Sequence, residues 1–135
     1  MEYKKGIHFS GDLECAILGV CMLEKEAFAR TIGLLEKENF YYSGNQIIYD
    51  ALAEMYSNGV YIDLLTVYDY IVNTKQIKEI NGENIAYYIS KLTNTVVSSA
   101  HLEYHGFIIK RMWMERELIR LTHGGIKLNG DVSQQ

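Results

Sequence analysis

Hydrophobic residues recur at helical spacing along most of the chain. A first helix, which the Ser10 side chain can cap, has an apolar face made of Leu13, Ala16, Ile17 and Val20. A short second helix follows within residues 27–35. The chain contains no proline, so no helix is broken in that way. The pattern predicts an all-α fold.

The clearest amphipathic helix begins at Ser43. Ser43 and Gln46 have the spacing of a capping box, in which two side chains satisfy two free backbone N–H groups reciprocally. The apolar face behind this pair consists of Ile47, Ile48, Ala51, Leu52, Met55 and Tyr56. The helix should end at Gly59, because glycine adopts the left-handed conformation of a helix stop.

Asp63 stands where the next helix needs an N-cap, since its carboxylate can accept the free N–H groups of the following turn. We expect a helix over residues 63–72, with an inward face of Leu64, Leu65, Tyr68, Ile71 and Val72. The β-branched and aromatic residues between 60 and 70 leave a strand as the alternative. Farther on, Asn81-Gly82 predicts a turn, residues 85–92 a short helix, and residues 93–99 a polar linker.

A long last helix is predicted from residue 98 or 99 at least to Thr122, and Gly124-Gly125 either ends or weakens it. It carries three apolar stripes: Leu102, Ile109 and Trp113; Ile108, Met112 and Ile119; and Phe107, Met114, Leu118 and Leu121. A helix that rests on one core needs a single stripe. The others must be covered by a helix outside this sequence or by another subunit, unless the helix is central in its own domain. We expect self-association through Phe107, Trp113, Met114, Leu118 and Leu121.

The composition predicts one folded domain and narrows the class of partner. The 135 residues are 48% hydrophobic, and their net charge is −4. Nucleic-acid binders usually show a basic surface, so weak or no direct nucleic-acid binding is expected. No apolar run is long enough to span a bilayer, and no signal peptide is visible, so the expected location is the cytoplasm.

Motifs for catalysis, cofactors or metals are missing from the sequence. Neither a phosphate-binding G-x-x-x-x-G-K-[ST] loop nor a G-x-G-x-x-G motif occurs. Cys15 and Cys21 lie on different helix faces and are read as core thiols. His101 and His105 share a helix face with zinc-ligand spacing, but Glu103 lies off that face and no third ligand is evident. We therefore expect no catalytic, cofactor-binding or metal-binding residues.

Several short segments resemble the N-terminal domain of bacterial replicative DNA helicases, the DnaB family. The most specific is Gly59-Val60-Tyr61-Ile62-Asp63-Leu64-Leu65-Thr66, which is similar to the family's G-x-P-I-D-x-x-T. The likeness spans about residues 12–119. Its other segments are Leu13 to Leu23, Asn39-Phe40-Tyr41, Ile48-Tyr49, Ile80-Asn81-Gly82, Ala86-Tyr87-Tyr88, Ile108-Ile109 and Arg116-Glu117-Leu118-Ile119. Tyr61 replaces the family's proline, and Asn81 replaces a glycine.

The resemblance implies a compact multi-helix head followed by a helical hairpin that pairs subunits into a collar on a hexameric ring. It divides the chain into a flexible tail (1–10), the head (11–97), a long helix that forms the first arm of a truncated hairpin (98–128) and a severed linker (129–135). The implied partners are a second copy of the chain, primase and, as a further candidate, a helicase loader. ATP and magnesium belong to an ATPase domain beyond this sequence.

Three other hypotheses compete with this one. The first is the helicase-binding domain at a primase C-terminus, which resembles the same fold. The second is a small helical enzyme that uses His101 and His105, and the third is an independent nucleic-acid binder. The acidic net charge argues against the last.

Overall fold

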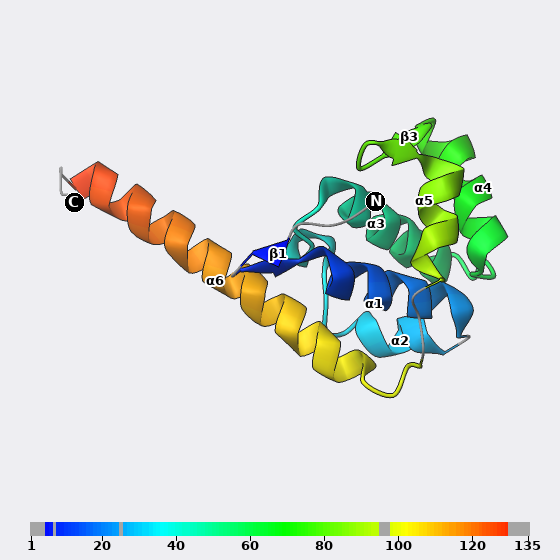
Figure 1. The fold of residues 1–135 in the computed structure, drawn as a ribbon, viewed down its shortest axis with the longest axis horizontal. Coiled ribbons are helices and arrows are strands. Elements are labelled where there is room, and N and C mark those ends of the chain that lie inside the picture. The colour runs from blue at the N-terminus through cyan, green and yellow to red at the C-terminus, as the bar shows by residue number, and fades with distance from the viewer. Residues whose placement is uncertain (1–4, 7, 25, 95–97, 130–135) are drawn as a thin grey trace.

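The computed structural model describes residues 5–6, 8–24, 26–94 and 98–129, with the backbone alone for residues 5–6 and 124–129. The helices are α1 (Gly11–Leu23), α2 (Ala27–Thr31), α3 (Ser43–Ser57), α4 (Leu64–Lys75), α5 (Ile85–Leu92) and α6 (Leu102–Asn129), with a 3-10 turn η1 (Lys37–Asn39). The strands have two residues each: β1 (Lys5–Gly6), β2 (Phe9–Ser10), β3 (Glu79–Ile80) and β4 (Glu83–Asn84). Helices α1–α5 form a head, and α6 runs along one side of it and projects beyond (Figure 1). The fold is all-α, as predicted.

Part of the N-terminal segment forms a pair of short strands. Strand β1 pairs with β2 in antiparallel fashion, with Gly6 opposite Phe9, and the Phe9 ring stacks on Tyr41 at a centroid distance of 4.1 Å. The prediction of a flexible tail over residues 1–10 is therefore wrong for these two strands, while residues 1–4 and 7 lie outside the described residues. Ser10 caps α1 as predicted, accepting a hydrogen bond from the Leu13 N–H at 3.3 Å.

The capping box predicted for Ser43 and Gln46 is not formed. Ser43 is already the first helical residue of α3, and Tyr42 in the N-cap position makes no side-chain cap. The Gln46 amide instead donates to the Phe40 carbonyl oxygen at 2.8 Å. The Gly44 N–H donates to the side chain of Asn81, at 2.9 Å. A side chain 37 residues away therefore replaces the local cap.

The connection from α3 to α4 has the geometry of a helix stop followed by a helix start. Gly59 has φ +68°, and the Val60 N–H donates to the Met55 carbonyl at 2.8 Å, which closes a Schellman motif. Asp63 occupies the N-cap of α4, where it accepts from the Thr66 N–H at 2.9 Å, and the Thr66 hydroxyl accepts from the Asp63 N–H at 2.8 Å. The segment is a helix and not the alternative strand.

Helix α4 turns inward most of the face that the sequence predicted, since Ile71 is buried and Leu64, Tyr68 and Val72 pack against the core. Its buried residues are Val67 and Ile71, whereas Leu65 is 74% exposed. Leu65 lies two residues from Val67, about 200° around the helix, so both cannot face the core. The expectation that Leu65 points inward is wrong.

The turn predicted at Asn81-Gly82 joins β3 to β4. Both residues have a left-handed backbone conformation, with φ of 51° for Asn81 and 81° for Gly82. Such a pair is the signature of a tight hairpin turn, and asparagine tolerates this conformation better than most residues. Asn84 then caps α5 by accepting from the Ala86 N–H at 2.9 Å.

Helix α6 begins later than predicted and continues past Gly124-Gly125 to Asn129. Residues 95–97 of the predicted linker and residues 130–135 of the predicted C-terminal segment lie outside the described residues. No helix in the described part of the chain is both long enough and apolar enough to cross a lipid bilayer.

Candidate functional site

Helix α6 lies against the head through one apolar face. Leu102 and Ile109 are almost fully buried, and Met112 is 7% exposed. Gly106, also on this face, leaves room for the Leu34 side chain, which a Cβ at position 106 would overlap. The head therefore buries three of the six residues of the first two predicted stripes, whereas Ile119 at the end of the second is 41% exposed.

Two arginines fix this helix to the head. Arg30 on α2 donates to both carboxylate oxygens of Glu103, each at 2.7 Å, and this partner lowers the pKa of Glu103 to about 2. Arg116 donates to the His8 carbonyl at 2.6 Å and the Asn39 carbonyl at 3.2 Å. Helix α6 is thus bound near its start and again about three and a half turns later.

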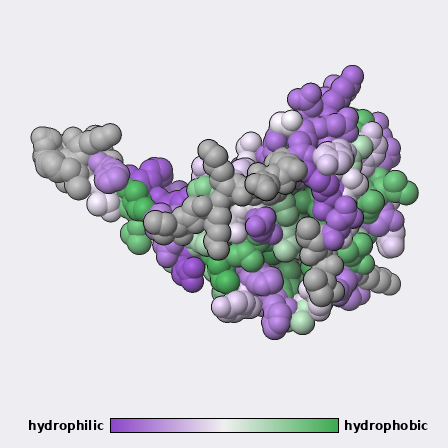
Figure 2. Space-filling model, in the orientation of Figure 1, coloured by the Kyte–Doolittle hydropathy of each residue, from purple (hydrophilic) through white to green (hydrophobic). Residues whose placement is uncertain are grey.

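A different face of α6 is exposed between residues 104 and 121. Tyr104, Phe107, Met114, Leu118 and Leu121 are between 54% and 65% exposed, and Arg111 lies between them with a side-chain exposure of 61%. We call these six residues the α6 stripe. Figure 2 shows hydrophobic side chains on the projecting part of the helix among hydrophilic ones. Large exposed apolar faces usually mark an interaction site.

The predicted self-association set divides between two faces. Phe107, Met114, Leu118 and Leu121 all lie on the α6 stripe, whereas Trp113 is half-buried on a neighbouring face. Sequence reasoning missed Tyr104 and Arg111. The six positions are separated alternately by three and four residues, the spacing of a coiled-coil seam, and this signal was available in the sequence.

The head contains a buried polar network that could be mistaken for a catalytic centre. Glu14 is 1% exposed and accepts from the Tyr41 N–H at 2.6 Å, the Tyr42 N–H at 3.4 Å and the Asn45 amide at 2.8 Å. Burial raises the pKa of Glu14, and these hydrogen bonds oppose the rise. The carboxylate holds the segment before α3 onto α1, so its role is structural.

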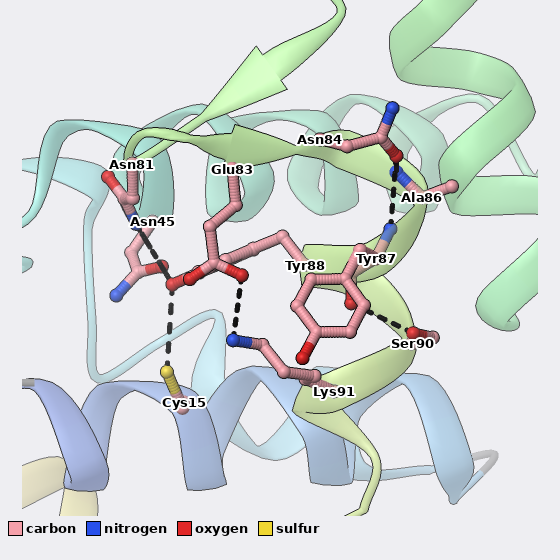
Figure 3. A network of polar contacts seen from close by, with 10 residues as sticks. All are labelled: Cys15, Asn45, Asn81, Glu83, Asn84, Ala86, Tyr87, Tyr88, Ser90 and Lys91. Carbon is pink, nitrogen blue, oxygen red and sulfur yellow. Dashed lines mark hydrogen bonds and ion pairs between the residues drawn. The ribbon is translucent and has the colours of Figure 1, made fainter. Parts of the chain in front are cut away.

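A second part of this network surrounds the Tyr88 hydroxyl (Figure 3). That hydroxyl donates to Asn45, accepts from the Asn81 amide at 2.9 Å, and lies 3.6 Å from Cys15 Sγ. Burial raises the pKa of Cys15 to about 12, so this thiol is a poor nucleophile. Asn81, at the position where the sequence departs from glycine, links α3 to α5.

The two candidate zinc ligands lie on α6 and beside it. The His101 and His105 rings are 6.2 Å apart, and Glu103 is bound to Arg30 and not to either ring. Among the described residues, no group of three or more His, Cys, Asp or Glu side chains is arranged to hold a metal ion.

The head has an exposed apolar area of its own, formed by the end of α1, the connection before α4 and the first turn of α4. Leu23, Val60, Tyr61 and Leu65 are between 41% and 74% exposed. Leu65 lines two open hollows of about 390 and 420 Å³. We call these four residues the head patch.

Comparison with known proteins identifies relatives along most of the chain. The model of the DnaB-like helicase N-terminal domain matches residues 8–111. The chain is 34% identical over 111 residues to "Replicative DNA helicase DnaB" of Rhodothermus marinus, covering 82% of this chain and 12% of that protein. It is 30% identical over 123 residues to the protein of the same name from Leifsonia xyli, covering 88% of this chain and 26% of that protein.

A solved structure has the same fold. The crystal structure of the N-terminal domain of DnaB helicase from Mycobacterium tuberculosis matches with a TM-score of 0.83 and 25% identity, over 95% of this chain and 90% of that one. The chain thus spans most of that domain, but at most about a quarter of the two full-length relatives named above.

Proposed function

The chain belongs to the family of DnaB-like helicase N-terminal domains, and on that premise we propose that it is a non-catalytic collar domain of a replicative DNA helicase. Its role is to join helicase subunits through α6 and to contact primase. The observation that carries this proposal is the exposed α6 stripe. The matched full-length relatives are replicative helicases, which favours this hypothesis over the primase domain that resembles the same fold.

The α6 stripe supports association with a second copy of the chain. Its alternating spacing of three and four residues suits a helix of the same kind, because such a seam packs side chains into matching holes. Its apolar members include two aromatic residues, Tyr104 and Phe107, and large aromatic side chains often dominate the energy of an interface. An alternative occupant is a further helix of the longer protein.

Sedimentation equilibrium tests the self-association. We expect the wild-type chain to associate and the variants Met114→Asp and Leu118→Asp to be folded monomers, since each places a charge in the seam. The matched control is Leu65→Asp in the head patch, which adds the same charge at another exposed leucine. If the wild type is a monomer at every concentration, self-association is refuted, and the α6 stripe would be covered by a further helix of the same subunit. Association that survives both helix substitutions would place the contact elsewhere, with Trp113→Asp as the next variant.

We further propose that catalysis belongs to another domain of the parent helicase, which would bind ATP and magnesium. The isolated chain should then hydrolyse no ATP above background, measured as phosphate release. Turnover by pure protein that is abolished by a substitution in this chain would contradict the assignment.

Contact with primase is the third part of the proposal, and it rests on family membership. We expect the cognate primase's C-terminal domain to bind the chain, measured by fluorescence anisotropy. If primase binds only the paired chains, Met114→Asp should lose this binding and Leu65→Asp should keep it. No binding to the associated wild type would remove primase from the proposed partners and leave a helicase loader as the remaining candidate.

A further inference from the structure

We propose that Arg111 and Glu115 determine the register and orientation in which two copies of α6 pair, through ion pairs that cross from one copy to the other. This inference rests on the self-association proposed above. It concerns Arg111, the charged member of the α6 stripe, and the carboxylate nearest to it.

The α6 stripe is symmetric about its centre. Counted from its two ends, Tyr104 matches Leu121, Phe107 matches Leu118 and Arg111 matches Met114. In a two-fold symmetric pair, each contact of residue i with residue j occurs twice. Antiparallel pairing centred between residues 111 and 114 therefore brings every position of both stripes into contact. A shift by one heptad would leave some positions at one end unmatched.

This register places Arg111 of one copy beside Glu115 of the other. Arg111 faces Met114 across the seam, and Glu115 follows Met114 on the edge of the seam where Arg111 lies. Within one copy the Arg111 Nε is already 3.5 Å from Glu115 Oε2, and both side chains are accessible. The second oxygen, Oε1, is 3.1 Å from His8 Nδ1, which orients the carboxylate. Two arginines and two glutamates would thus meet at the centre of the pair.

A charge within an apolar seam selects the arrangement that pairs it. Polar residues at seam positions specify register at some cost in stability, and unpaired charges disfavour wrong partners. Parallel pairing in register would place the two Arg111 side chains opposite each other, and like charges repel. The antiparallel arrangement instead gives each arginine a glutamate from the other copy.

Charge-reversed variants separate this role from an ion pair within one chain. Arg111→Glu and Glu115→Arg should each weaken self-association by about tenfold or more, because like charges then meet across the seam. Mixing the two single variants should restore association as a mixed pair, since each chain supplies the charge that the other lacks. An ion pair within one chain cannot be restored by mixing. Arg120→Glu, on the same helix but off the stripe, is the matched control and should leave association unchanged.

Disulfide trapping tests the orientation independently. In the proposed register, two copies of residue 114 are offset by about 4.5 Å along the helix axis and two copies of residue 104 by about 26 Å. Met114→Cys should therefore form a covalent dimer on mild oxidation, and Tyr104→Cys should not. Parallel pairing would link both variants. The wild-type chain, oxidised in the same way, is the control for covalent dimers formed through its own thiols, Cys15 and Cys21.

The outcomes distinguish this inference from the proposed function. If the wild type does not associate, the self-association fails and this inference fails with it. If it associates but the mixture is no better than either variant alone, or Tyr104→Cys is also trapped, the inference is overturned while self-association stands. Thermal unfolding of each variant checks that the exposed substitutions leave the head folded.

Discussion

Leu52 in the head and Leu118 on α6 are both leucines on helices of the same chain, but their environments differ completely. Leu52 is fully buried, whereas Leu118 is 65% exposed. In the head, apolar faces of α1, α3, α4 and α5 meet one another, and their burial stabilises the fold. On α6 one apolar face is left open. The comparison shows that hydrophobic periodicity locates apolar faces without saying whether a face serves folding or assembly.

The largest expected effect separates these two leucines directly. Leu52→Ala should lower the free energy of unfolding by about 2–5 kcal/mol, because it leaves a cavity in the core. Leu118→Ala should change it by less than about 0.5 kcal/mol, because its side chain is exposed. Urea unfolding at a concentration where the chain is monomeric measures both. Similar losses for the two variants would contradict the division into a folding face and an assembly face.

A smaller loss is expected from the buried carboxylate of the head. Glu14→Gln keeps the size of the side chain but removes one acceptor oxygen for three N–H donors, which should cost about 1–3 kcal/mol at neutral pH. The control is Glu79→Gln, an exposed carboxylate on β3, which should change stability little.

The pH dependence of the same variant has a definite sign. Burial raises the pKa of Glu14 above its ordinary value of about 4.3, so the folded state binds the proton more tightly than the unfolded state does. The stabilisation that comes from binding this proton is fully present below the ordinary pKa. It is lost as the pH rises through the pKa of Glu14 in the folded state. Glu14→Gln should abolish this decline, and an unchanged pH profile would assign the decline to other groups.

Next in size is the helix cap at Asp63. Asp63→Ala should cost about 1 kcal/mol, because the Thr66 N–H loses its acceptor. Asp63→Asn should cost much less, since an amide oxygen also accepts at an N-cap. Chemical denaturation measures both variants. Equal losses for alanine and asparagine would show that the carboxylate charge, and not the cap, is what matters here.

The smallest effect is expected at the exposed ion pair that joins α6 to the head. Arg30 lowers the pKa of Glu103 to about 2, so its contribution is present above the ordinary glutamate pKa and is lost as the pH falls toward 2. This sign is opposite to that of Glu14. Because both side chains are exposed, salt should screen the effect. Melting temperatures of wild type and Glu103→Gln between pH 5 and 2.5, at low and high salt, measure it, and a salt-independent difference would contradict a surface ion pair.

The features that the sequence predicted well depend on residues close together in the chain. The Asp63 cap, the Gly59 stop and the Asn81-Gly82 turn each involve only a few neighbouring residues, so local rules suffice to place them. The apolar stripes of α6 also follow from periodicity alone. Periodicity does not predict how deeply each stripe is buried. Trp113 is half-buried and Met114 is 54% exposed, although the two residues are adjacent.

The features that were missed depend on contacts between distant segments. The start of α3 is capped by Asn81, and its preceding residues are held by Glu14, so the local Ser43 signal was overridden. Gly44 shows the same dependence, because a Cβ there would overlap Ile80 and Asn81. No pattern within α3 contains this information.

The position of Arg116 makes the rest of α6 a lever. Its guanidinium is bound to the His8 and Asn39 carbonyls, whereas residues 118–123 are all exposed. From Arg116 to Asn129 the helix extends by about 20 Å at 1.5 Å per residue. A rotation of 10° about this anchor would therefore displace the far end by about 3.5 Å. Small rotations of α6 at the contact between Arg116 and the head therefore become displacements of several ångströms at the C-terminal end of the helix.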